Sequence, residues 1–325
     1  MPFIYRYLVL MLCGTLLVAC ELNSDVPTNS ATTAEVDRKA PSLFAQPVPL
    51  KSGYALLSCD PDYNNRIDHP ISLVDMDVIR PLVHACVDND NLHIYYNGVI
   101  NNELQSLMKA LTVAATEEGI QYHTLEIDSP GGEIDAALSI GDELWNGDWG
   151  IWVKPGARCY SACVLLLAGA TSRSMSDGSV GIHRMLNPKS QARTPDELQA
   201  ELDLHLHSVK KYLTKYGANP ALADLMMTVP SKELRILTQE EIRQFGLDGT
   251  NPVKADLARL DVARRCGDDF LRRWDNLKQL NEKECSITRE GSTQKYIACL
   301  NRNYDRLGFP DPKCPYDGPA RIPSP

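Results

Sequence analysis

Two residues of this chain, Ser161 and His183, have the chemistry that acyl transfer requires. Ser161 directly precedes the apolar run 162–168, which predicts a helix. His183 follows the short apolar segment 180–182, which predicts a strand. A serine at the start of a helix lies beside unpaired N–H groups, and a histidine at a neighbouring strand end can take the hydroxyl proton. The sequence therefore offers a nucleophile and a general base.

A glycine turn upstream supplies a further requirement of this chemistry. An apolar strand around Leu125 and Ile127 runs into the sequence Asp128-Ser129-Pro130-Gly131-Gly132. Glycines let the backbone turn tightly and leave an N–H group open to an oxygen that gains negative charge. A turn of this composition is also common between ordinary elements, and an isolated serine or histidine is usually structural. The residue types and spacing alone are therefore a weak signal.

The elements around these residues alternate between strand and helix. Residues 92–98 and 150–153 predict strands, whereas 104–115 predict a helix with one apolar face. Another helix follows the glycine turn, with its apolar residues at Ile134, Ala137, Leu138, Ile140 and Leu144. After the histidine, Thr194-Pro195-Asp196-Glu197 predicts the start of a long helix. This alternation predicts an α/β core.

The segment 125–184 resembles the Clp-protease/crotonase superfamily, and most of all its Clp-type serine peptidases. The matching residues are Ile127-Asp128-Ser129-Pro130-Gly131-Gly132, Ser161, Ala168-Gly169-Ala170 and Gly181-Ile182-His183. The step of 29 positions from Gly132 to Ser161 agrees with the family spacing between oxyanion glycine and nucleophile. The resemblance extends from 92–100 to 235–247 and implies a spiral of β-β-α units.

Carried over position by position, the resemblance implies roles for four residues. Ser161 would be the nucleophile, His183 the general base, and Gly132 and Ala162 the backbone donors of an oxyanion hole. The implied substrate is a peptide or an unfolded polypeptide. Crotonases bind acyl-thioesters on the same fold without a serine, so the serine and histidine favour the peptidase branch. A lysine base, as in signal-peptide peptidases of this superfamily, would have to be Lys154, which no motif supports.

The acid that would orient His183 does not carry over cleanly. In the family it immediately precedes the residues that match 235–237, and here that position is Leu234. Glu233 is one place away, and one step along a strand reverses the face to which a side chain points. A bulge that re-aims Glu233, the use of Asp224, or a serine–histidine dyad are the alternatives. The rival to an enzyme is a binding or envelope-assembly protein that keeps the fold without turnover.

The N-terminus resembles the leader of a bacterial lipoprotein. Residues 1–19 have a cationic front and an apolar run too short to span a membrane. The run ends in Leu17-Val18-Ala19-Cys20, which resembles a lipobox, and acylation of Cys20 would anchor the chain to a membrane. An ordinary signal peptide with a chance cysteine is the alternative. Glu21, by resemblance to the sorting rule, favours the outer membrane, with the protein facing the periplasm.

Ten cysteines support export. Cys13 leaves with the leader and Cys20 takes the lipid, so eight remain, and an exported chain favours disulfides. Cys159 and Cys163 bracket the serine and are close enough in sequence to form a bridge that holds its turn. The other candidates are Cys59 and Cys86 near the N-terminus and Cys266, Cys285, Cys299 and Cys314 near the C-terminus. The last four allow three connectivities.

Five regions are expected along the 325 residues. They are a signal peptide (1–19), a flexible tether (20–50), an N-terminal extension (51–90), a Clp-peptidase-like domain (91–250) and a cysteine-rich helical unit (255–325). The formal charge of −9 and the absence of a basic run disfavour nucleic-acid binding. No cofactor fingerprint and no metal-ligand spacing is present, so neither group is expected. In the family the long helix after Thr194 joins subunits; a surface helix packed on its own domain is the alternative.

Overall fold

The computed structural model describes residues 48–62, 68–175, 177–187, 189–289 and 292–315. All of these belong to one of two compact units, Ser42–Pro325. The predicted signal peptide, the lipidation candidate Cys20 and nearly all of the predicted tether lie outside the described residues. Among the helices that are described, none is long and apolar enough to cross a membrane.

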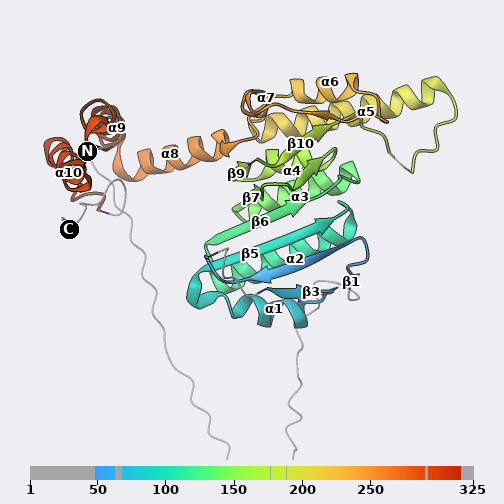
Figure 1. Cartoon of the computed structure of the whole chain (residues 1–325), viewed down its shortest axis with the longest axis horizontal. Helices are drawn as coiled ribbons and strands as arrows, with labels where there is room; N and C mark the ends of the chain where they lie inside the picture. The colour runs from blue at the N-terminus through green and yellow to red at the C-terminus, as the bar shows by residue number, and fades with distance from the viewer. Residues whose placement is uncertain (1–47, 63–67, 176, 188, 290–291, 316–325) are drawn as a thin grey trace, which may run out of the picture. The chain divides into compact units, whose positions relative to one another are not determined.

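A seven-stranded sheet organises the chain, in the order β12-β9-β7-β6-β5-β2-β3 (Figure 1). Its parallel centre consists of β5 (Asn91–Gly98), β6 (Tyr122–Asp128), β7 (Trp149–Val153) and β9 (Ser172–Met175). Antiparallel strands complete the edges: β2 (Gly53–Ser58), β3 (His69–Ile71) and β12 (Gly249–Thr250). A separate pair joins β1 (Val48–Pro49) to β4 (Leu73–Val74). The α/β class expected from the sequence is confirmed.

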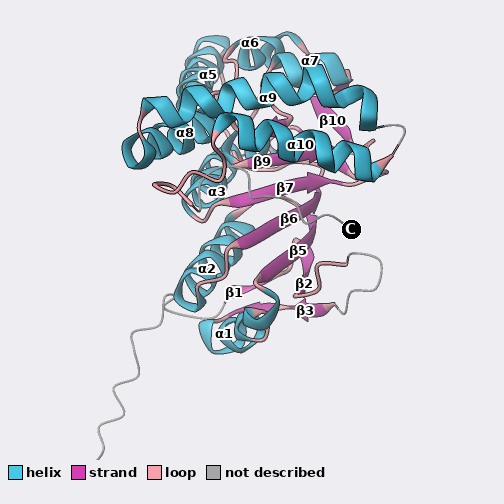
Figure 2. Ribbon diagram, turned by 90° about the vertical axis from the view of Figure 1, so that its left-hand side faces the viewer, coloured by secondary structure: helices cyan, strands magenta, loops and turns pink. Residues whose placement is uncertain are grey.

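Helices α2 (Asn102–Glu118) and α3 (Ile134–Asn146) lie along one face of this sheet (Figure 2). Their apolar faces are buried against it, as the 3.6-residue period of their apolar residues predicts. Asn101 caps α2 and the left-handed Gly119 ends it, which gives the predicted helix definite ends. The same layer includes α1 (Met76–His84), which packs on α2.

A smaller three-stranded sheet, in the order β11-β10-β8, contains the strands that lead to Ser161 and His183. β8 (Arg158–Tyr160) and β10 (Ser179–Ile182) are parallel, and β11 (Arg235–Ile236) pairs with β10 in the antiparallel sense. Helix α4 (Cys163–Gly169) follows β8 and is completely buried. The predicted helix 162–168 and strand 180–182 are thus present.

The long helix predicted after the histidine is α5 (Pro195–Lys215). Thr194 and Glu197 form a reciprocal capping box at its start. Near its end, the Tyr212 hydroxyl donates to the Leu165 carbonyl oxygen at 3.0 Å, which fixes α5 to the buried helix α4. Two short helices follow, α6 (Ala221–Thr228) and α7 (Gln239–Gln244).

The C-terminal part is helical and has its own hydrophobic cluster. It consists of α8 (Pro252–Cys266), α9 (Asp268–Arg289) and α10 (Thr293–Leu307). The most buried members of the cluster are Phe270, Leu277, Cys285, Cys299 and Phe309. Disulfides join Cys266 to Cys314 and Cys285 to Cys299, which selects one of the three connectivities that the sequence allowed. Near the N-terminus, Cys59 is bonded to Cys86.

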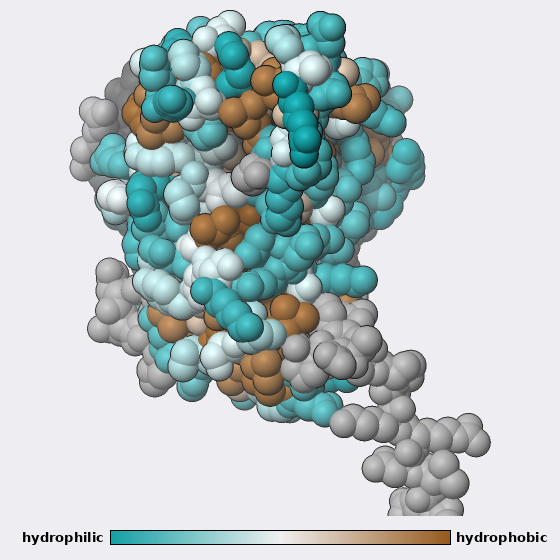
Figure 3. All heavy atoms as spheres, turned by 90° about the vertical axis from the view of Figure 1, so that its right-hand side faces the viewer, coloured by the Kyte–Doolittle hydropathy of each residue, from teal (hydrophilic) through white to brown (hydrophobic). Residues whose placement is uncertain are grey.

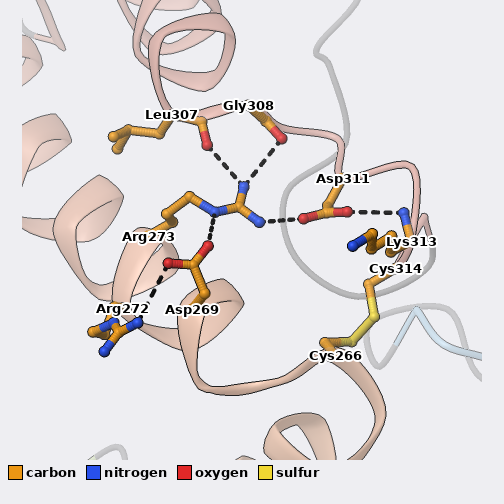
Figure 4. A network of polar contacts seen from close by, with 9 residues as sticks. All are labelled: Cys266, Asp269, Arg272, Arg273, Leu307, Gly308, Asp311, Lys313 and Cys314. Carbon is orange, nitrogen blue, oxygen red and sulfur yellow. Dashed lines mark hydrogen bonds and ion pairs between the residues drawn. A yellow bond between two sulfur atoms is a disulfide. The ribbon is translucent and has the colours of Figure 1, made fainter.

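Arg273, near the start of α9, connects this helix to the end of α10 (Figure 4). Its guanidinium donates to the carbonyl oxygens of Leu307 and Gly308 at 2.9 and 3.3 Å. It also forms ion pairs with Asp269 and Asp311. Hydrogen bonds from the Arg273 guanidinium, followed by its positive charge, lower the pKa of both carboxyl groups. A single side chain therefore provides hydrogen-bond donors to the last carbonyl groups of α10 and a positive charge to Asp311, which follows that helix.

Replacing Arg273 with alanine should destabilise the C-terminal helices by roughly 2–3 kcal/mol, because two carbonyls and the buried Asp311 lose their charged donor. Urea unfolding and amide hydrogen exchange would measure this. Arg272→Ala is the control, since Arg272 is exposed and reaches Asp269 only at 3.5 Å. The two carboxyl groups stabilise the folded state while they are ionised, because their pKa values are lower there than in the unfolded chain. The effect of Arg273→Ala on the free energy of unfolding should therefore decrease as the pH falls below about 4. Equal effects of the two substitutions would contradict the assignment.

Candidate active site

Ser161 and His183 lie at the carboxyl ends of two adjacent parallel strands. β8 ends one residue before Ser161 and β10 ends one residue before His183, with Tyr160 paired to Gly181. The Ser161 N–H group donates to the Gly181 carbonyl oxygen at 2.8 Å. Because neighbouring strands are about 4.8 Å apart, the two residues are close in space. Both side chains are partly exposed to solvent.

The backbone at Ser161 has an unusual conformation that its surroundings hold in place. Its φ of 55° is in the left-handed region, which is uncommon for a residue with a Cβ atom. The expected disulfide between Cys159 and Cys163 is present, with Cα atoms 5.1 Å apart, and both cysteines are fully buried. The bridge closes a five-residue loop with the serine at its centre. Such strain persists where neighbouring structure restrains it, and it is often found at functional sites.

The glycine turn packs directly on the serine turn. A Cβ atom added at Gly131, whose φ is 104°, would lie 2.6 Å from both the Ser161 Cβ and the Tyr160 carbonyl oxygen. One added at Gly132 would lie 2.0 Å from the Ile100 carbonyl oxygen. Glycine is therefore required at both positions by the close approach of other backbone and side-chain atoms.

Two backbone donors beside the serine are unpaired. Among the residues that the structure describes, no acceptor receives a hydrogen bond from the N–H groups of Gly132 or Ala162. The next N–H group, that of Glu133, donates to the Ile100 carbonyl oxygen at 2.8 Å. Backbone donors in partly buried positions are normally paired. Both the Gly132 and the Ala162 donors are groups that the resemblance assigned to an oxyanion hole, and the N–H group of Cys163 at the start of α4 is likewise without an acceptor among the described residues.

The ring of His183 is held by a backbone carbonyl group. Its Nδ1 atom is 3.0 Å from the carbonyl oxygen of Arg184. Since a carbonyl oxygen can only accept, this contact places the proton on Nδ1 and leaves the lone pair on Nε2, which is the form that a general base needs. This contact could not be predicted from the sequence, because the acceptor is a backbone carbonyl oxygen, which every residue has.

The acids considered from the sequence do not contact His183 within the described residues. Glu233 is exposed in the loop before β11. If the pairing of β10 with β11 is continued by one residue, Leu234 lies opposite His183 and Glu233 lies one step beyond. Asp224 on α6 forms an ion pair with Lys210 at 2.6 Å. Neither acid has a contact through which to orient the imidazole ring.

Lys154 is bound elsewhere. Its Nζ atom is 2.5 Å from the Glu126 carboxylate and 4.4 Å from the centre of the Tyr95 ring. Glu126 is fully buried and also contacts the His93 ring at 2.9 Å. A lysine base must reach the serine with a free amine, whereas this amine is committed to a carboxylate on the sheet. No cluster of three metal-binding side chains occurs in the part of the chain that is described.

Breaking the Cys159–Cys163 bond should reduce turnover more than stability. Its loop is the shortest of the four that the described disulfides close, so the bond restricts the unfolded chain least, but it positions Ser161. For Cys159→Ala with Cys163→Ala, we expect kcat to fall by about 10- to 100-fold with little change in KM, since small misplacements are costly. The matched control removes the other short-range bond, Cys285–Cys299, and should preserve kcat. Equal losses of kcat in the two double variants would contradict the positioning role.

Comparisons with known proteins identify no family. No family model matches the chain, and no curated protein matches it either. Among solved structures, a lysine-to-alanine mutant of the 1510-N membrane-bound stomatin-specific protease in complex with a substrate peptide is 22% identical, with a TM-score of 0.38 over 47% of this chain and 71% of that one. A serine-to-alanine mutant of that protease is 20% identical, with a TM-score of 0.38 over 47% of this chain and 75% of that one. At these values the likeness carries no argument about function, which depends on the site itself.

Proposed function

We propose that this protein is a serine hydrolase that cleaves peptide bonds through an acyl-enzyme on Ser161. The observation that carries the proposal is the meeting of three features at adjacent strand ends. These are a serine in a restrained left-handed turn, a histidine whose Nδ1 faces a carbonyl oxygen, and two N–H groups without an acceptor among the described residues. Each feature has an ordinary structural explanation alone, but together they are the parts of an acyl-transfer site.

The reaction follows from these positions. The Ser161 Oγ attacks the substrate carbonyl carbon while the His183 Nε2 takes the hydroxyl proton. The N–H groups of Gly132 and Ala162 bind the oxygen that becomes negative. The C–N bond then breaks, and the imidazolium gives its proton to the leaving amine. A water molecule, deprotonated by the same nitrogen, attacks the ester and releases the acid and the free serine.

The Arg184 carbonyl replaces only part of what a carboxylate does in a triad. It keeps the proton on Nδ1, and it offers the imidazolium a dipole in place of a full negative charge. Exchanging the acid of a serine protease triad for an amide lowers kcat by about 10⁴-fold because the wrong tautomer forms. Here the tautomer is correct, so we propose a working serine–histidine dyad whose turnover is slow but well above the uncatalysed rate.

The core of the chain is proposed to have the Clp/crotonase fold. The proposal is supported by the positions of the motif residues Ser161 and His183, which directly follow the parallel strands β8 and β10. Association of copies through α5 is part of the same proposal, and the exposed side chains of Leu198 and Leu204 on that helix support it. The substrate class implied is short peptides or unfolded segments.

The protein is further proposed to be a lipoprotein of the cell envelope. Acylation of Cys20 would attach it to the membrane, most readily the outer one, with the hydrolase facing the periplasm. The four disulfides support an oxidising compartment, where such bonds persist. Metabolic labelling with a palmitate analogue, compared between the natural chain and Cys20→Ser, tests the attachment; equal labelling of both would overturn it.

A peptide library distinguishes hydrolysis from binding. The oxidised mature chain is incubated with the library, and peptides in solution and on the protein are identified by mass spectrometry. The proposal predicts new peptide termini and, with an activated peptide ester, a burst of about one equivalent of leaving group. Both should be absent from Ser161→Ala. Intact peptides retained equally by both proteins would instead indicate a catalytically silent binding or envelope-assembly protein.

A further inference from the structure

A polar pocket of about 220 Å³ lies next to the glycine turn. Of its side chains, Glu133 directly follows the predicted oxyanion donor Gly132, and Asp135 is two positions further on. Consecutive Cα atoms are 3.8 Å apart, so the pocket begins within one residue of the site where the substrate carbonyl would bind. The segment after His183 and helix α5 also contribute to the lining.

The walls of the pocket carry more negative than positive charge. The Lys189 amine is 2.7 Å from the Glu133 carboxylate, and Asp135 supplies a second acid. His205 lines the pocket from α5 with Glu201 at 3.7 Å beside it. Asn187 and two apolar side chains complete the lining. The lining itself thus has two carboxylates and one lysine, and the Glu201 carboxylate lies beside His205 outside the lining.

The one lysine is the part of the lining that is most easily displaced. The side chain of Lys189 is 73% exposed, whereas that of Glu133 is 31% exposed. An exposed ion pair of this kind contributes little stability, so another cation can replace the lysine at small cost. The face of the molecule seen in Figure 3 is mainly polar, with apolar residues in separate patches.

We propose that this pocket binds a basic side chain, lysine or arginine, on the substrate residue whose carbonyl group is attacked; this rests on the proposed peptidase function. The ammonium or guanidinium group takes the place of Lys189 at the Glu133 carboxylate, and Asp135 adds a second favourable charge. A water molecule occupies roughly 30 Å³, so the pocket has room for the end of either side chain. An apolar residue would instead remove water from the acids without offering them a partner.

The test uses peptides that differ only at the residue before the cleaved bond, which is lysine, arginine, glutamine, leucine or glutamate. We expect kcat/KM to be at least about tenfold higher for lysine and arginine than for leucine, as one charge-assisted hydrogen bond provides. Glu133→Gln should remove this advantage, so that the ratio of kcat/KM for the lysine and arginine peptides to that for the leucine peptide falls to about one. Lys189→Ala should increase cleavage of the basic peptides, because it frees the Glu133 carboxylate.

Glu117→Gln is the matched control. Glu117 is also a partly exposed carboxylate in an ion pair with a cation, Arg80, but it lies at the far end of α2. Its substitution should change none of the ratios. A basic preference that persists in Glu133→Gln, or its absence in the natural protein, would overturn the proposal.

The outcome for this pocket can be separated from that for the hydrolase. Covalent labelling of Ser161 by a fluorophosphonate needs no substrate side chain, so it reports the catalytic residues alone. Labelling together with a preference for glutamate would identify Lys189 as the binding group and would overturn the inference, while the hydrolase would stand. Absence of both labelling and cleavage would overturn the proposed function, and the inference with it.

Discussion

Replacing Ser161 with alanine should lower kcat/KM for a peptide substrate by about 10⁴- to 10⁶-fold while the protein remains folded. Loss of the nucleophile removes the whole acyl-enzyme route and leaves only the contribution of the oxyanion donors and of binding. The Ser161 side chain makes no hydrogen bond within the described residues. Alanine, like serine, has a Cβ atom, so the left-handed backbone conformation at this position should cost about the same with either residue. We therefore expect a change in the free energy of unfolding of at most about 0.5–1 kcal/mol. Steady-state kinetics and urea unfolding measure the two quantities.

Ser208→Ala is the control for this substitution. Ser208 is exposed on α5, so its loss should change neither activity nor stability. His183→Ala should approach the effect of the nucleophile variant, because a serine without a base is a poor nucleophile at neutral pH. Activity in Ser161→Ala within tenfold of the natural protein would show that any hydrolysis belongs to another residue.

Replacing Gly131 with alanine should lower kcat/KM by about 100- to 1000-fold, the cost of losing one oxyanion donor. The added Cβ atom would lie 2.6 Å from the Ser161 Cβ and the Tyr160 carbonyl oxygen, so the turn must move. That movement carries the adjacent Gly132 N–H away from the serine. Kinetics on the same peptide measure the loss, and burst amplitude shows whether acylation is the step affected.

Gly119→Ala separates backbone strain from this clash. Gly119 also has a left-handed backbone, with φ 73°, but no atom lies within 4 Å of the Cβ that alanine would add. It should therefore cost only the strain of about 1–2 kcal/mol and retain full activity. If folded Gly131→Ala protein kept activity within threefold of the natural protein, the glycine turn would have no part in the reaction.

The long elements were predictable because their apolar periodicity is strong. α2 and α5 have regular apolar faces and definite caps, and both occur where the sequence places them. The nearness of Ser161 to His183 was expected only weakly from the order of strands and turns, and mainly from the resemblance to Clp-type peptidases. β8 was not predicted, since it has only three residues and no recurring pattern. Its position depends on pairing with β10, which is a tertiary contact.

The finer arrangement of the site depends on groups that leave no trace in the sequence. The His183 ring is held by the Arg184 carbonyl, an atom that every residue has. The ion pair between Glu133 and Lys189 joins positions 56 residues apart. The connectivity of the last four cysteines depends on how α9 packs against α10. Each of these contacts forms only when the chain has folded and distant segments meet, so the local sequence could not predict it.

Fluorophosphonate labelling of the oxidised mature protein, followed by mass mapping, tests whether Ser161 is an activated nucleophile. We predict a single adduct on the peptide that contains Ser161, and its loss in both Ser161→Ala and His183→Ala. The Ser208→Ala protein should label like the natural one. No adduct on folded protein with its four disulfides intact, or an adduct on a different residue, would contradict the assignment of this site.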